Sequence, residues 1–301
     1  MAIWGVSLDE AEGVKNDIEK IFKIIQSNDE ALDDLARGGD YYKRLKSYFC
    51  HWVRFVRTSS VIPSGTPFYR VRRLDANNEN GVLNVSGLKY APKGKAFGRM
   101  NNHSYNVMYS SYHEYTAISE CRLKEGDLFQ LTRFKSKQPL NYFELGFFSR
   151  LYFTTPRDSE FFREQVQKTF GFKDAMDSTV GGFAALESAL MDGLYAIHDE
   201  PEISYYLSSI IADAIFTEFE GIDAVMFPSL QQRFGVNLSF KECVADNLEV
   251  DYTCVNEIIN KYTTGNYKYY TKLECTDFTK DILEYKKVSD DLGGFINFTC
   301  R

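Results

Sequence analysis

Four residues whose side chains suit one kind of chemistry are spread over the middle of the chain. Ten residues separate Arg99 from Tyr109 and eleven more lead to Glu120, whereas Ser229 lies much further along. An arginine fork binds phosphate oxygens, a tyrosine offers a flat face, and an ionised carboxylate stabilises positive charge on a bound group. No histidine near Ser229 in the sequence can act as its base, so we expect this hydroxyl to orient a ligand and not to attack it. Together these residue types predict a site for a phosphate-bearing ligand on which positive charge develops.

The four residues stand in short motifs, and the order of these motifs carries a resemblance. The motifs are Gly98-Arg99-Met100-Asn101, Val107-Met108-Tyr109, Ala117-Ile118-Ser119-Glu120, Gly221-Ile222-Asp223-Ala224-Val225-Met226-Phe227-Pro228-Ser229 and Gly235-Val236-Asn237-Leu238. Each motif is weak alone, but the linked set is specific. Over roughly residues 68–240 the chain resembles the RES family, which is named for its arginine, glutamate and serine. Met100 stands where that family usually carries tryptophan.

The resemblance implies an enzyme that degrades NAD, as bacterial toxins of this family do. NAD is then the substrate, its nicotinamide–ribose bond is broken by hydrolysis or phosphorolysis, and inorganic phosphate is a possible second ligand. A small helix-turn-helix antitoxin of the Xre type is the implied protein partner. The implied catalytic residues are Arg99, Tyr109, Glu120 and Ser229. The implied contacts to NAD come from Arg70, Arg99, Asn101, Tyr109, Ser229 and Asn237.

Two other functions remain open at this point. An enzyme with the same pocket can transfer ADP-ribose to a macromolecule or a small molecule, and the sequence does not separate transfer from hydrolysis. A protein of a different class, a non-catalytic module that senses a nucleotide or binds another protein, is also compatible with these residues. We expect the enzyme that degrades NAD.

Composition limits the partners. The 301 residues carry a net charge of −7, which argues against a broad nucleic-acid or anionic-membrane surface because both require a basic face. The six cysteines include no Cys-x-x-Cys pair, and the four histidines show no metal-ligand spacing, so we expect no metal. With no apolar run of about 18 residues and no leader-like start, a cytoplasmic protein is expected.

Hydrophobic periodicity predicts the elements that position these residues. Residues 8–57 are predicted to be helical, with Ser7 or Asp9 as the cap, and so are residues 114–122 and 203–215. Polar residues 75–86 and the lysine-bearing stretch 88–98 are expected to be loops. Predicted strands cover residues 68–72, 105–109, 127–134, 224–227 and 267–275, and a last helix is expected at 281–287.

These elements predict an α+β fold. The resemblance implies a split, mixed β-sheet core of ADP-ribosyltransferase type that is covered by helices, preceded by an N-terminal helical unit. We expect a helical region over residues 1–60, the RES-like domain over 61–240, and a C-terminal extension over 241–301 that packs on the same domain.

Overall fold

The computed structural model describes residues 5–76, 78–90, 98–101, 106–170, 177–195, 201–263 and 266–288. The chain forms two compact units, each assembled from separate stretches of sequence. The helical unit comprises Met1–Ser60, Lys93–Asn106 and Asn141–Val225, and the sheet unit comprises Val61–Pro92, Val107–Leu140 and Met226–Arg301.

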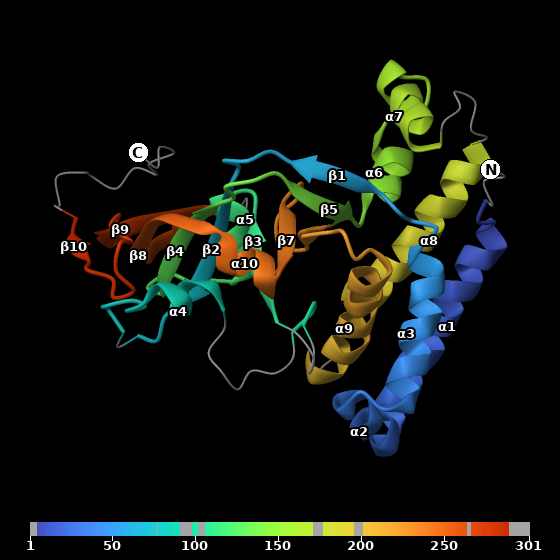
Figure 1. Cartoon of the computed structure of the whole chain (residues 1–301), viewed down its shortest axis with the longest axis horizontal. Helices are drawn as coiled ribbons and strands as arrows, with labels where there is room; N and C mark the ends of the chain where they lie inside the picture. Colours follow the sequence, from blue (N-terminus) through green and yellow to red (C-terminus); the bar gives the residue numbers. More distant parts are fainter. Residues whose placement is uncertain are drawn as a thin grey trace. The chain divides into compact units, whose positions relative to one another are not determined.

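The helical unit combines helices from both ends of its sequence range. Its helices are α1 (Leu8–Ser27), α2 (Asp29–Arg37), α3 (Asp40–Val53), α6 (Phe147–Thr154), α7 (Glu160–Phe170), α8 (Asp177–Tyr195) and α9 (Pro201–Glu218). In Figure 1, α1 lies beside α8 and α3 beside α9, and these pairs are in contact. The first sixty residues therefore share a core with α8 and α9.

The sequence itself explains why α1 forms and which face it buries. Ser7 and Glu10 make a capping box, in which each side chain accepts a hydrogen bond from the other's backbone N–H, so that backbone donors left open at a helix start are satisfied. Ser7 is therefore the cap, one of the two residues predicted. The buried side chains recur every three to four residues: Ala11, Val14, Ile18, Ile21 and Ile25.

The strands form one sheet in the order β1-β5-β6-β7-β3-β2-β4-β8-β9-β10. The strands that lie wholly in the sheet unit are β2 (Pro67–Arg73), β3 (Val107–Ser111), β4 (Leu128–Lys135), β7 (Val236–Lys241), β8 (Glu249–Lys261), β9 (Tyr267–Cys275) and β10 (Lys286–Lys287). All pairings in the run from β7 to β10 are antiparallel. The remaining strands, β1 (Ser59–Ile62), β5 (Leu140–Glu144) and β6 (Ala224–Pro228), hold residues of both units.

The sheet is split between β2 and β3. These strands are paired at one position, Tyr69 opposite Ser111, whereas β2 pairs with β4 along its whole length, from Pro67 to Arg73. The backbone beyond the Tyr69–Ser111 pair is thus released from the ladder. Such an opening allows side chains from β2 to reach the backbone of β3.

Short helix α5 (Glu114–Glu120) covers one face of the sheet. Ala117 and Ile118 pack in a core cluster with Val71, Phe129 and Leu131 of β2 and β4. Burying these side chains fixes the helix on the sheet. Its last residue, Glu120, is exposed at the edge of the covered face.

The α+β class with N-terminal helices is confirmed, as are most of the expected elements. One expected element is wrong: residues 281–287 form no helix, because Ile282 bridges to Asn84 and Lys286 pairs with Glu274. The segment 75–90 is also not wholly a loop, because it contains α4 (Val85–Lys89). The division at residues 60 and 240 stays a prediction. Among the described helices, none is both long and apolar enough to cross a membrane.

Candidate active site

Strand β3 presents two polar side chains on the face that carries α5. Tyr109 and Ser111 are two residues apart, and side chains at that spacing point to the same face of a strand. They pair with Ser239 and Asn237 of β7, respectively, and directly opposed residues share a face. The pairing of Tyr69 with Ser111 extends this face to β2.

Glu120 receives two side-chain hydrogen bonds on one carboxylate oxygen. Its Oε1 accepts from Ser229 Oγ at 2.6 Å and from Asn237 Nδ2 at 2.7 Å. Residues separated by more than a hundred positions in the sequence thus converge on one oxygen. Oε2 accepts no hydrogen bond from the described residues, and the side chain is exposed. The carboxylate is held in place at one oxygen while the other remains open to a ligand.

Ser229 is oriented by the turn that follows β6. Its Oγ accepts hydrogen bonds from the backbone N–H groups of Gln231 at 3.1 Å and Gln232 at 3.0 Å. A hydroxyl has one proton and two lone pairs, so these two bonds leave the proton for Glu120. An oxygen engaged in this way is a poor nucleophile, which agrees with the orienting role expected from the sequence.

Asn237 is oriented by Ser111, a residue that the sequence analysis did not single out. Ser111 Oγ donates to Asn237 Oδ1 at 2.7 Å, which leaves the Asn237 NH₂ group as the donor to Glu120. Both side chains are buried. Ser111 lies two residues after Tyr109 but beyond the predicted strand 105–109, and it shares the face of Tyr109 only because β3 continues to Ser111.

The loop from Ser229 to Gly235 is fixed against α5. Ser229 N–H donates to the Gly235 carbonyl at 2.8 Å, and Thr116 Oγ1 donates to Gln232 Oε1 at 2.6 Å. A Cβ atom at Gly235 would lie 2.8 Å from Thr116 Cγ2, closer than packed atoms come. Glycine at this position therefore lets the loop approach the helix that carries Glu120.

Arg70 bridges the opening between β2 and β3. Its Nη1 donates to the Tyr109 carbonyl at 2.8 Å. Burial, together with the charge of Arg72, lowers the pKa of Arg70 to about 10, and its Nε is buried without a hydrogen-bond partner. On β2, Arg70 alternates with Tyr69 and Val71, so its side chain leaves the strand on the face opposite α5. The structure ties Arg70 to the backbone of Tyr109 and not to Glu120.

Arg99 and Asn101 belong to the helical unit. The Arg99 guanidinium donates to the carbonyl of Leu194 near the end of α8, and its Cζ lies 5.5 Å from the centre of the Tyr195 ring. Asn101 is buried and forms an isolated bridge with Gly98. Met100 is fully buried, so the methionine in this motif is a core side chain.

The lysines of the stretch 88–98, which was expected to be a loop ahead of Arg99, divide into two groups. Lys89 is buried and donates from Nζ to the carbonyl of Asp246 at 2.7 Å. It therefore serves the packing of α10 (Glu242–Asn247) and is not a loop cation. Lys93 and Lys95 lie outside the described residues.

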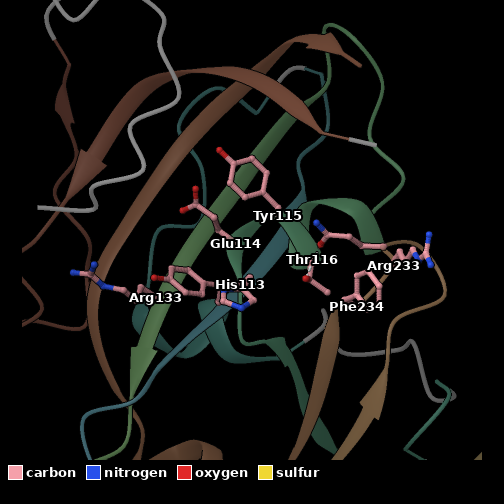
Figure 2. A pocket seen from close by; sticks show the side chains of 10 residues that line it. His113, Glu114, Tyr115, Thr116, Arg133, Arg233 and Phe234 are labelled. Carbon is pink, nitrogen blue, oxygen red and sulfur yellow. Dashed lines mark hydrogen bonds between the residues drawn. The ribbon is translucent and has the colours of Figure 1, made fainter. Parts of the chain in front are cut away.

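A hollow of about 540 Å³ opens in the sheet unit at the start of α5. Its lining includes Tyr69, His113, Tyr115 and Arg133, together with loop residues 232–235. Figure 2 shows Arg133 and Arg233 at opposite ends of the row of side chains, with Thr116 between them and Phe234 beside it. Thr116 precedes Glu120 by four residues, so the hollow begins about 5–6 Å, one helical turn, from the Glu120 position.

Metal ligands do not gather anywhere in the part of the chain that the structure describes, where no group of three or more His, Cys, Asp or Glu side chains is placed to hold an ion. The described cysteines Cys50, Cys121, Cys243, Cys254 and Cys275 are all free thiols.

Comparison with known proteins identifies the family. No curated protein and no solved structure matches the chain. The RES domain model matches residues 67–248, a span that contains Arg70, Arg99, Tyr109, Glu120 and the Ser229–Asn237 segment. RES domains are associated with toxin–antitoxin systems that act on NAD. Because the match covers more than half of the 301 residues, the chain belongs to the RES domain family.

Proposed function

We propose that this protein is an NAD-degrading enzyme that breaks the nicotinamide–ribose bond and acts as a toxin by depleting NAD. The observation that carries the proposal is the carboxylate of Glu120, which is held at Oε1 by Ser229 and Asn237 and belongs to an exposed side chain. A group held in this way before the substrate arrives needs little reorganisation when charge develops beside it.

The chemistry follows from the charges. When the bond between ribose C1′ and the nicotinamide nitrogen breaks, its electron pair leaves with nicotinamide, which departs as a neutral molecule. The ribose becomes an oxocarbenium-like cation. Glu120, as an anion, stabilises this cation and accepts hydrogen bonds from the ribose hydroxyls. An oxygen of water or of inorganic phosphate then bonds to C1′, giving ADP-ribose or its phosphate ester; water loses a proton in that step.

The other site residues hold the dinucleotide in this proposal. Tyr109 lies on the same face of the sheet unit as Asn237 and offers its ring to the nicotinamide or the ribose. Arg99 binds pyrophosphate oxygens through its guanidinium, and Asn101 supports the same motif. Arg70 acts indirectly, because its guanidinium fixes the backbone of Tyr109.

Product analysis tests the proposal. Purified protein is incubated with NAD, with and without inorganic phosphate, and the products are separated. Free nicotinamide with ADP-ribose indicates hydrolysis, and the phosphate ester indicates phosphorolysis. Label that stays on a protein or small-molecule acceptor indicates ADP-ribosyl transfer, and intact NAD despite measurable binding indicates a nucleotide-sensing module. The last two outcomes contradict the proposal.

The role of Arg99 is tested by Arg99→Ala with Arg99→Lys as its matched control. A charged hydrogen bond to the substrate contributes about 1.5–3 kcal/mol, so we expect KM for NAD to rise at least about tenfold in Arg99→Ala and less in Arg99→Lys. A KM unchanged in Arg99→Ala removes Arg99 from the site.

The implied partner is a small helix-turn-helix antitoxin. The proposal predicts that such a protein suppresses NAD cleavage when the two are produced together. The toxin role can also be tested without this partner. A host that produces the wild-type chain alone should stop growing, and a host that produces Glu120→Gln should grow.

A further inference from the structure

Phe234 combines two unusual properties for a surface residue of the sheet unit. It is 85% exposed, although a phenylalanine gains most from burial. Its backbone φ is +65°, a conformation that is strained for a bulky side chain. Neither property helps the chain to fold, so the residue is a candidate for a role in binding.

The loop around Phe234 is hydrogen-bonded on both sides, so the backbone that carries the ring is held in place. Ser229 Oγ accepts from Gln231 and Gln232 at one end, and Gly235 N–H donates to the Gln232 carbonyl at 2.9 Å at the other. Gln232 is also bonded to Thr116 of α5. The same loop therefore supplies Ser229 to Glu120 and Phe234 to the hollow.

The hollow combines flat rings with charged groups. Phe234, Tyr69, Tyr115 and His113 line it, and its charged residues are Arg133, Arg233 and one carboxylate, Glu114. The guanidinium of Arg233 lies 4.9 Å from the centre of the Phe234 ring, and Arg233 makes no ion pair with the described residues. Arg133 at the other end forms an ion pair with Asp251 at 2.8 Å, and Lys135 contacts the same carboxylate. Of the two arginines of the hollow, Arg233 beside the exposed ring is therefore the one without an ion pair to the described residues.

We infer that this hollow binds the adenine nucleotide half of the dinucleotide, with the base stacked on Phe234 and its phosphate near Arg233. Bases stack on exposed aromatic side chains, and guanidinium groups bind phosphates. The nicotinamide ring of NAD carries a positive charge, so it is a poor occupant beside Arg233. The hollow also has the volume of a small-molecule site.

This inference rests on the proposed function only for the identity of the nucleotide, and binding measured without turnover tests it. The titrants are AMP and nicotinamide mononucleotide, and the readout is calorimetry on wild type, Phe234→Ala, Arg233→Gln and Leu230→Ala. Leu230 is the matched control, because it is a 52% exposed apolar residue of the same loop that does not line the hollow.

The expected result is selective. AMP binds wild type and Leu230→Ala alike, and its Kd rises about tenfold in Phe234→Ala, as the loss of one stacking contact requires. Arg233→Gln also weakens the binding of AMP. Nicotinamide mononucleotide, in contrast, binds all four proteins equally. AMP that fails to bind, or that binds Phe234→Ala as tightly as wild type, overturns the inference.

The assay of NAD cleavage on the same preparations separates the two proposals. If wild type cleaves NAD but AMP affinity is unchanged in Phe234→Ala, the adenine site is refuted and the proposed function stands. AMP binding that depends on Phe234 in a protein that cleaves no NAD refutes the proposed function and keeps the adenine site.

Discussion

Two carboxylates, one in each unit, show how the surroundings of an acid decide what it can do. Glu120 in the sheet unit is exposed and takes two hydrogen bonds on Oε1. Glu187 in the helical unit is fully buried; its Oε2 accepts from the backbone N–H of Ser149 at 2.8 Å, and its Oε1 is buried without a partner. Both acids are anchored, but only Glu120 has an oxygen that a ligand can reach.

The difference is also electrostatic. Burial raises the pKa of Glu187 to about 7, although its hydrogen bonds to the backbone at Ser149 and Gly146 act in the opposite direction. Removing a carboxylate from water disfavours its charged form. A buried acid of this kind makes the stability of the fold depend on pH. An exposed, hydrogen-bonded carboxylate is instead suited to stabilise charge on a substrate.

The largest expected effect comes from neutralising Glu120. Glu120→Gln keeps the shape and an oxygen that can accept both hydrogen bonds, but it removes the negative charge that opposes the developing cation. We expect kcat for NAD to fall about 10²–10³-fold, the range seen when one preorganised electrostatic contact is lost. Binding of ADP-ribose should change much less than kcat. Turnover within a few-fold of wild type contradicts the assignment.

The next effect concerns Glu187 and stability. Its folded pKa, about 7, lies above its ordinary value of 4.5, so the folded state binds more protons between these values and stability falls as pH rises through that window. At about 1.4 kcal/mol per pKa unit, the loss is up to a few kcal/mol. The side chain in Glu187→Gln is neutral at every pH, so this variant should lose the fall in stability between these pH values.

Urea unfolding at pH 5 and pH 8 measures this effect in wild type and in Glu187→Gln. The wild type should lose more stability between the two pH values than the variant does. Equal losses show that Glu187 ionises in the folded protein as it does in the unfolded chain.

A smaller effect is expected from the serine that orients the amide bonded to Glu120. Ser111→Ala leaves Asn237 Oδ1 without its donor, so the amide that holds Glu120 is free to turn. Loss of one buried hydrogen bond costs about 1–3 kcal/mol, and we expect kcat to fall about tenfold. The matched control is Ser110→Ala, because Ser110 Oγ is also buried but has no hydrogen-bond partner.

Parallel measurement of kcat for these two serine variants separates positioning from general damage. Equal losses in both show that any change in β3 disturbs the enzyme and that Ser111 has no specific role. Asn237→Ala combined with Ser111→Ala should be no worse than Asn237→Ala alone, since the two residues act in series.

Local patterns in the sequence were sufficient for elements that show one hydrophobic face. Residues 267–275 alternate regularly and form β9, and the apolar spacing of residues 203–215 lies within α9. β8 escaped prediction because its centre is buried on both faces and includes polar Thr253 and Asn256. Thr253 bonds to Gln130 and Thr132, so polar residues there mark a buried network and not solvent.

The residue types of the site could be predicted from the sequence, but the hydrogen bonds that join them could not. Motif spacing pointed to Glu120, Ser229 and Asn237, yet nothing local indicates that the second and third both donate to the first. That convergence depends on the β3–β7 register and on the loop packed against α5. Phe234 was missed for a similar reason, because its strained φ and its exposure exist only in the folded chain.

The decisive measurement is nicotinamide release from NAD by wild type, Glu120→Gln and Glu187→Gln at one pH and one protein concentration. It asks whether cleavage of NAD depends on the exposed carboxylate of Glu120. The same chemical change is made at the exposed and at the buried acid. We expect Glu187→Gln to release nicotinamide at the wild-type rate and Glu120→Gln to release about 10²–10³-fold less. Equal release by the two variants, or none by wild type, contradicts this expectation.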